Sequence, residues 1–182
     1  MKLLKIFDKR DTKIGSQDII YRNAARAIIL NDHKILLVYS DTTKEYKFPG
    51  GGIDKEETRQ EALKREVLEE VGREVKSVNE CLGYTDQIYN DIYDTHKYFY
   101  QRSYYYFCEI TEEYHGLKLS ESERALRFLP KWVEIDEAIR INEEKIASGT
   151  AFPWTERELY VLELLKGMNL WEDSRKPEAM SK

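Results

Sequence analysis

The sequence predicts a single α/β (α+β) domain in which a mixed β-sheet carries helices on both faces. Segments with the composition of strands lie before and after one amphipathic helix, and further helical segments follow them. This order of strands, helix, strands and helices is typical of layered domains that contain one sheet. The length of 182 residues is enough for one hydrophobic core.

Extended segments are expected on both sides of the central helix. A short strand and turn are expected in 5–15, and residues 26–30 and 34–39 form a predicted hairpin that turns at 31–33. After the helix, 74–89 and 97–110 have the composition of strands, and the second is rich in Tyr and Phe. A polar loop then leads into a strand that ends near Ile135.

The central helix is expected over Thr58–Val71. Thr58 followed three residues later by Glu61 fits a capping box, and Gly72 marks the end of the helix. The apolar stripe along it consists of Leu63, Val67 and Val71.

Two later helices are also expected. One is predicted to begin with Asp136 as its N-cap, and the last with Thr155 as its N-cap and Glu158 in the reciprocal position. The predicted organisation is an N-terminal strand or extension in 1–21, a domain in 22–167 and a polar tail in 168–182.

Composition excludes several classes of protein. A net charge of −5 without a basic block argues against binding to duplex DNA or to a membrane surface. The N-terminus lacks the pattern of a signal peptide, and we expect a cytoplasmic protein in which Cys81 and Cys108 are reduced thiols. The three histidines are scattered, which disfavours a histidine metal site.

Acidic residues crowd the second half of the central helix. Glu66, Glu69 and Glu70 are spaced to share one side of it, and the apolar stripe lets them face outward. Neighbouring like charges repel one another and raise one another's pKa, and a divalent cation removes both penalties. Oxygen ligands favour Mg²⁺ or Mn²⁺. The alternative is a solvated amphipathic helix, but the preceding run Gly50–Gly52 lets a ligand approach the main chain and favours a site.

The segment Gly51 to Arg73 resembles the Nudix box, G-x5-E-x7-R-E-U-x-E-E-x-G-U, in which U is a bulky apolar residue. The matching residues are Gly51, Glu57, Arg65, Glu66, Val67, Glu69, Glu70 and Gly72. The one departure is Arg73, which stands where an apolar packing residue is expected. The flanking strands and the segment "WVEIDEAI" also look like this family, so the resemblance covers roughly residues 22–142.

The resemblance implies a Nudix-type α/β/α sandwich and a Mg²⁺-dependent (or Mn²⁺-dependent) hydrolase. Such enzymes cleave the P–O–P bridge of a nucleoside diphosphate linked to another moiety by attack of water. By similarity, the metal ligands are Glu66, Glu69, Glu70, Glu57 and the carbonyl of Gly51. The implied catalytic residues are Glu66, Glu69, Arg65 and Glu123, and the implied substrate contacts are Gly50, Gly51, Gly52 and Phe48.

Several points stay open at this level. The general base is one of the helix glutamates or a loop carboxylate, Glu121 or Glu123, of which we favour Glu123. The substrate is a nucleoside triphosphate, ADP-ribose, a dinucleoside polyphosphate or a nucleotide sugar. Replacing Glu70 by Gln is expected to lower turnover by orders of magnitude and to leave thermal unfolding nearly unchanged.

Two other functions on the same fold are alternatives. An isopentenyl-diphosphate-isomerase-like enzyme needs a catalytic cysteine and additional histidines, and a non-catalytic nucleotide-sensing module has no need of the acids. The aromatic strand, Trp132 and Trp154 are expected to pack rather than to stack on a base. The resemblance also makes a homodimer an expectation.

Overall fold

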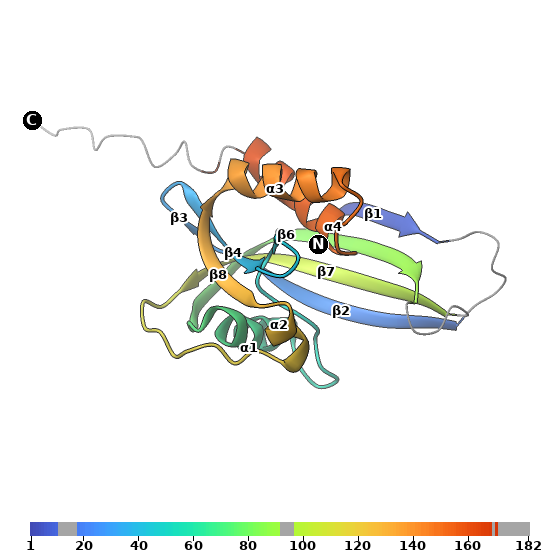
Figure 1. The fold of residues 1–182 in the computed structure, drawn as a ribbon. Coiled ribbons are helices and arrows are strands. Elements are labelled where there is room, and N and C mark those ends of the chain that lie inside the picture. The colour runs from blue at the N-terminus through green and yellow to red at the C-terminus, as the bar shows by residue number, and fades with distance from the viewer. Residues whose placement is uncertain (11–17, 92–96, 169, 171–182) are drawn as a thin grey trace, which may run out of the picture.

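The computed structural model describes residues 1–10, 18–91, 97–168 and 170. It contains two four-stranded sheets and four helices in the described residues (Figure 1). The strands are β1 (Leu3–Lys9), β2 (Asp18–Ile28), β3 (Leu30–Asn31), β4 (Lys34–Ser40), β5 (Glu45–Lys47), β6 (Val75–Asn90), β7 (Lys97–Ile110) and β8 (Phe128–Glu134). The helices are α1 (Arg59–Val71), α2 (Glu121–Ala125), α3 (Ile135–Ala147) and α4 (Thr155–Gly167).

The larger sheet is mixed and has the order β1-β6-β7-β2. β6 and β7 are antiparallel, whereas β1 is parallel to β6 and β2 is parallel to β7. The N-terminal strand is therefore an edge of the same sheet as the strands that follow the helix. The predicted strand segments are confirmed, although residues 11–15 of the first one lie outside the described residues.

The smaller sheet is antiparallel and consists of β3, β4, β5 and β8, with β8 paired to β4. The predicted hairpin is confirmed, because β3 and β4 pair around a turn in which Asp32 has φ +50°. A short bridge from Ala24 to Gly52 and a hydrogen bond from Ala25 to Gly51 (3.0 Å) join the glycine loop to β2. The loop that precedes α1 is thus fixed on the larger sheet.

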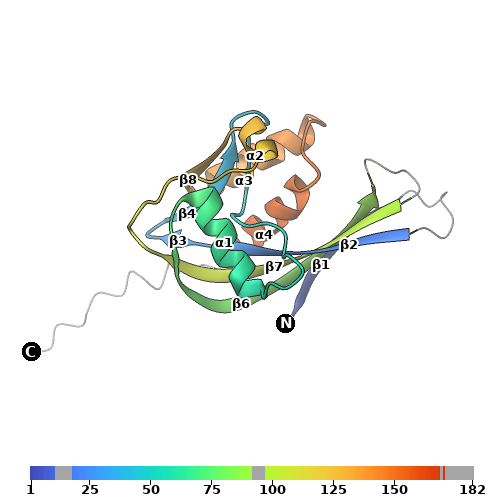
Figure 2. The same cartoon turned by 90° about the horizontal axis from the view of Figure 1, so that it is seen from below.

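Helices lie on both faces of the larger sheet, as predicted. Figures 1 and 2 show α1 on one face and α3 and α4 on the other. Successive residues of β7 point to opposite faces, so Tyr104 and Tyr106 pack with Leu63 and Val67 of α1, while Tyr105 packs on the opposite side. The packing role expected for these tyrosines is confirmed.

The central helix begins and ends as the sequence predicts. Thr58 and Glu61 form a complete capping box, and Gly72 ends the helix with φ +73°. A cap of this kind contributes about 1 kcal/mol to stability. The acids do not all face outward, however, because Glu66 and Glu70 are buried beside the apolar stripe, at 8% and 1% exposure.

The predicted caps of the two later helices are wrong. α3 begins at Ile135 after Glu134, and the side chain at that N-cap makes no capping bond. Thr155 is the first residue of α4 rather than its cap, and its hydroxyl bonds to the buried carboxylate of Glu45. Glu158 instead accepts a hydrogen bond from the backbone N–H of Phe48 (2.9 Å). At α4, tertiary contacts to Glu45 and Phe48 thus replace the local cap.

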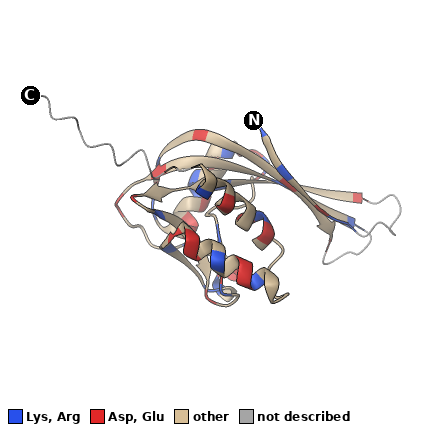
Figure 3. Ribbon diagram, turned by 90° about the horizontal axis from the view of Figure 1, so that it is seen from above, with Lys and Arg blue, Asp and Glu red and all other residues tan. Residues whose placement is uncertain are grey.

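Charge is distributed over the whole fold. Figure 3 shows Lys and Arg interspersed with Asp and Glu on strands and helices alike. In the described part of the chain, no helix has the length and apolar character needed to cross a bilayer. Cys81 and Cys108 are both free thiols.

Candidate active site

The glycine loop, Gly50–Gly52, lies between β5 and α1 and is hydrogen-bonded to a side chain near the end of α1. The N–H of Gly50 donates to a carboxylate oxygen of Glu70 (2.8 Å). The carbonyl of Gly50 accepts hydrogen bonds from Lys47 (3.3 Å) and from Arg26. Gly50 has φ +129°, and a Cβ at this position would lie closer than 3.0 Å to the carbonyl oxygen of Ala25. Only glycine fits this conformation and this contact.

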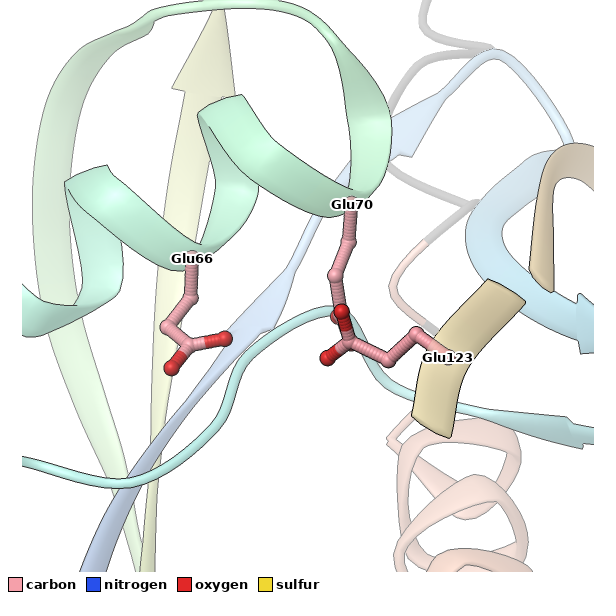
Figure 4. A group of neighbouring side chains, drawn as sticks. All are labelled: Glu66, Glu70 and Glu123. Atoms are coloured by element: carbon pink, nitrogen blue, oxygen red, sulfur yellow. The ribbon is translucent and has the colours of Figure 1, made fainter. Parts of the chain in front are cut away.

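Three carboxylates meet beside this loop. Oxygens of Glu66, Glu70 and Glu123 all lie within 4.8 Å of one another. Glu66 and Glu70 are one helical turn apart on α1, and Glu123 points toward them from α2 (Figure 4). Glu69, which the resemblance places among the metal ligands, lies outside this group and accepts a hydrogen bond from Arg65 (3.3 Å).

Arg65 ties the acidic residues together. It donates to both oxygens of Glu57 (2.7 and 2.8 Å), to Glu66 (2.9 Å) and to the carbonyl of Gly52 (3.0 Å). Its guanidinium lowers the pKa of Glu57 to about 2. Glu57 also accepts from the N–H of Asp54 (3.1 Å). Both oxygens of Glu57 are therefore engaged in holding the loop and Arg65.

Gly51 lets the carboxylate of Glu66 lie against the main chain. A Cβ at Gly51 would come closer than 3.0 Å to all three atoms of that carboxylate group. The Gly51 carbonyl, a predicted metal ligand, accepts the hydrogen bond from Ala25 and keeps a second lone pair. A Cβ at Gly52 would meet the side chain of Arg22. The glycines are therefore needed for close packing around the acids.

Lys47 places a positive charge directly on the carboxylate cluster. Its ammonium is ion-paired with Glu70, and the side chains are only 9% and 1% exposed. Burial lowers the pKa of Lys47 and raises that of Glu70, while the ion pair opposes both shifts. The sequence reasoning missed Lys47, since a single lysine in a short strand carries no spacing signal.

Glu123 reaches the cluster because of a short helix that the sequence reasoning placed in a polar loop. Ser120 caps α2, and Glu123 completes the capping box by accepting from the Ser120 N–H (2.7 Å). Glu121, the other candidate for the general base, is exposed and is not in the cluster. The spacing from Ser120 to Glu123 is a capping signature and was the available clue to this helix.

A cavity of about 620 Å³ opens beside Glu70 and Glu123. Four cationic residues, four aromatic residues and two glutamines are among those that line it: Arg22, Arg26, Lys47, Arg157, Tyr89, Phe128, Phe152, Trp154, Gln87 and Gln101. The rings of Phe152 and Trp154 pack against each other with centroids 4.1 Å apart and an angle of 33° between their planes. The buried Arg157 bonds to Glu158 (3.0 Å to Nε) and to Gln87 (3.0 Å).

Two aromatic residues lie differently from the sequence-based expectation. Phe48, expected as a substrate contact, has no exposed surface and packs edge-to-face on Tyr105 in the core. Trp154, expected only to pack, lies on the cavity wall. Phe48 follows Lys47 directly, and adjacent residues of an extended chain point to opposite sides, so its ring lies in the core while Lys47 lines the cavity.

The donor set of the cluster fits a hard divalent cation. It offers only carboxylate oxygens, the ligands that Mg²⁺ and Mn²⁺ prefer. A buried group of acids needs positive charge, and the ammonium of Lys47 supplies it on one side of Glu70. The arrangement therefore matches a site for a divalent metal ion at the mouth of a cationic and aromatic cavity.

A family profile described as NUDIX domain matches residues 20–155. The chain belongs to the NUDIX domain family. This membership makes it a hydrolase that acts on pyrophosphate bonds. The search of curated proteins gives no match.

Two solved structures are among those that match the chain. The solution structure of the E. coli ORF135 protein has 20% identity and a TM-score of 0.51, and the match covers 86% of this chain and 97% of that one. The crystal structure of a MutT NUDIX hydrolase from Burkholderia pseudomallei has 19% identity and a TM-score of 0.46, over 64% and 85% of the two chains. At 20% identity, the match to ORF135 shows a similar fold and no more.

Proposed function

We propose that this NUDIX protein is a Mg²⁺-dependent or Mn²⁺-dependent hydrolase that cleaves the pyrophosphate linkage of a nucleoside diphosphate derivative. The observation that carries the proposal is the meeting of Glu66, Glu70 and Glu123 at one end of a cavity with cationic and aromatic walls. A pyrophosphate needs positive charge around it, and a nucleobase needs a flat apolar surface.

The carboxylates of Glu66, Glu70 and Glu123 are the residues that would hold the metal ion. When bound, the ion neutralises phosphate oxygens and makes water a stronger nucleophile. Arg65 keeps Glu66 in place through its 2.9 Å hydrogen bond, and Glu57 keeps Arg65 in place. Glu69 shares Arg65 with Glu66 and is a further candidate ligand only after a change of rotamer.

Glu123 is the candidate to accept the proton of the attacking water. It is carried by α2, apart from the helix that supplies the other two carboxylates, and it is less buried than Glu70. One of its oxygens is occupied by the N–H of Ser120, which orients the carboxylate and leaves the other oxygen available.

The cationic wall would bind the substrate's phosphates, and the aromatic wall its base. Arg26 is buried, and its Nε has no hydrogen-bond partner among the described residues. Arg26 and Lys47 both line the cavity and give this wall the positive charge that phosphate groups need. The aromatic rings of Phe152 and Trp154, which line the cavity, would offer the apolar surface for the base.

The structure does not favour an isomerase that depends on a cysteine. Cys108 is buried, and burial raises its pKa to about 12. Cys81 packs with the same core cluster as Leu63 and Val67 of α1. Both thiols are thus on the α1 side of the sheet, away from the cavity walls.

A substrate panel with product identification tests the proposal. Nucleoside triphosphates, ADP-ribose, dinucleoside polyphosphates and nucleotide sugars are incubated with Mg²⁺ or with EDTA, and products are identified by ³¹P NMR. We expect cleavage between phosphorus atoms of at least one substrate, loss of activity in EDTA and in Glu123→Gln, and full activity in Glu121→Gln. Turnover that persists in EDTA, or no cleavage of any pyrophosphate, would overturn the proposal. Sedimentation of the same sample tests the expected homodimer.

A further inference from the structure

We infer that Lys47 is a cation that exchanges partners: it neutralises Glu70 in the metal-free protein and binds a phosphate oxygen of the substrate once a metal ion has taken Glu70. This inference rests on the proposed function and adds to it a substrate-contacting residue outside the Nudix box.

Burial is the first argument. Lys47 is 8% exposed, and a buried ammonium without an anion is costly, so it must keep a partner at every stage. In the described residues its one ion-pair partner is Glu70, a member of the carboxylate cluster. A divalent cation on Glu70 would compete with the ammonium for the same carboxylate.

The surroundings of Lys47 allow the exchange without a rearrangement of the chain. The ammonium lies 3.3 Å from the carbonyl oxygen of Gly50 and 4.9 Å from the ring centroid of Phe128. Both contacts hold a cation, and neither involves a carboxylate. Lys47 therefore keeps two of its three contacts when Glu70 is withdrawn.

The cavity gives the ammonium a place for its new partner. Lys47, Arg26 and Glu70 line the same cavity, and the two cations converge on the carbonyl of Gly50. Arg26 adds a second positive charge to this wall of the cavity. A phosphate group bound in the cavity beside these two side chains would replace the lost anion of Lys47.

Competition between Lys47 and the metal ion predicts opposite changes in metal affinity and phosphate affinity, which a purely structural role of Lys47 does not. Removing the ammonium frees Glu70 for the metal ion and at the same time removes a ligand of the phosphate. Metal affinity is therefore expected to rise and phosphate affinity to fall. A residue that only holds the fold would weaken both or change neither.

The test uses the full-length chain and two probes, Mn²⁺ alone and imidodiphosphate in the presence of saturating Mn²⁺. Calorimetric titrations at pH 8 are run on wild type, Lys47→Met and Lys47→Arg. The matched control is Lys131→Met, an exposed lysine on β8 that lies over an aromatic ring, as Lys47 does. Circular dichroism verifies that each variant is folded.

In Lys47→Met we expect Mn²⁺ to bind at least about fivefold more tightly and imidodiphosphate at least about tenfold more weakly, which corresponds to about 1 kcal/mol or more in each case. Lys47→Arg is expected to recover imidodiphosphate binding to within about threefold of wild type. The control should leave both affinities unchanged. Unchanged or weaker Mn²⁺ binding in Lys47→Met, or unchanged imidodiphosphate binding, would overturn the inference.

A measurement on the wild-type chain covers the case in which Lys47→Met does not fold. The ¹⁵Nζ resonance of Lys47, assigned by its absence from Lys47→Arg, is followed by NMR. We expect Mg²⁺ to shift or broaden this resonance, because it removes the ion pair with Glu70. Added imidodiphosphate should sharpen the resonance again, because a bound phosphate slows the exchange of the ammonium protons with water. A resonance that responds to neither probe, while both bind, refutes the exchange and leaves the proposed function standing. Failure of wild type to bind Mg²⁺ at all would instead refute the proposed function.

Discussion

The stability of the protein should depend on the ion pair between Lys47 and Glu70, and Glu70→Gln tests this dependence. The sequence alone suggests that this change leaves thermal unfolding nearly unchanged. The burial of both side chains, 8% and 1% exposed, reverses that expectation. The substitution leaves the Lys47 ammonium buried without its anion. It also replaces the charged carboxylate that accepts the 2.8 Å hydrogen bond from the N–H of Gly50 by a neutral amide.

The magnitude follows from the surroundings of the pair. Breaking a buried ion pair by removing one partner costs about 3–5 kcal/mol. Glu66 and Glu123 have oxygens within 4.8 Å of Glu70, so part of their negative charge still acts on Lys47 and places the cost near the lower end. A loss of about 3 kcal/mol lowers the midpoint of thermal unfolding by roughly 6–12 °C in a chain of this size.

The assay is urea and thermal unfolding in EDTA at pH 7.5, followed by circular dichroism. Glu70→Gln, Lys47→Met and the double variant are compared with wild type. Because the double variant buries no unpaired charge, it should be more stable than Glu70→Gln by about 1–2 kcal/mol. A midpoint for Glu70→Gln within about 1 °C of wild type, or a double variant whose loss equals the sum of the single losses, would refute the reasoning.

Three further predictions concern the loop, the bracing arginine and the cavity wall. Gly51→Ala should weaken Mn²⁺ binding by at least about tenfold in a calorimetric titration, because its Cβ displaces the Glu66 carboxylate. Glu57→Gln should lose about 1 kcal/mol of stability in urea at pH 7. Arg65 lowers the pKa of Glu57 from 4.5 to about 2 in the folded chain, so the Glu57 carboxylate contributes its full stability above pH 4.5. The difference in stability between wild type and Glu57→Gln should therefore disappear as the pH falls toward 2. Trp154→Leu should raise KM for a nucleotide substrate about tenfold and change kcat by less than about threefold, because base stacking contributes about 1–3 kcal/mol.

Each of these predictions has a matched control in the chain. Gly167→Ala adds a Cβ into open space and should leave metal binding unchanged. Glu56→Gln removes a neighbouring exposed acid and should leave stability unchanged at every pH. Trp132→Leu changes a tryptophan on β8 that does not line the cavity. Equal effects in a variant and its control would contradict the corresponding prediction.

Local signals were sufficient for much of the fold. The capping box at Thr58, the terminating Gly72 and the apolar stripe place α1 correctly, because those interactions all lie within one helix. The hairpin and the aromatic strand are likewise set by turn residues and alternation. The cap of α4 was mispredicted because a buried partner on β5 competes for the hydroxyl of Thr155, as its bond to Glu45 shows. At α3 the helix begins one residue before Asp136, whose carboxylate pairs with Lys166 of α4 (2.7 Å) instead.

The site was predictable where the ligands share one helix and not where they come from distant segments. The positions of Glu66 and Glu70 follow from a spacing of four residues. Glu123 was a candidate only by resemblance, and its place in the cluster depends on α2. Nothing local reveals that Lys47 and Arg26 converge on the carbonyl of Gly50, because that contact requires the pairing of the loop with β2.

The central claim is that Glu66, Glu70 and Glu123 together bind a divalent metal ion. The most direct test is the titration of the metal-free chain with Mn²⁺, in which free Mn²⁺ is measured by electron paramagnetic resonance. We expect saturable binding by wild type, at least about tenfold weaker binding by Glu66→Gln and by Glu123→Gln, and unchanged binding by Glu121→Gln. Equal Mn²⁺ affinities in wild type, Glu66→Gln and Glu123→Gln would contradict it.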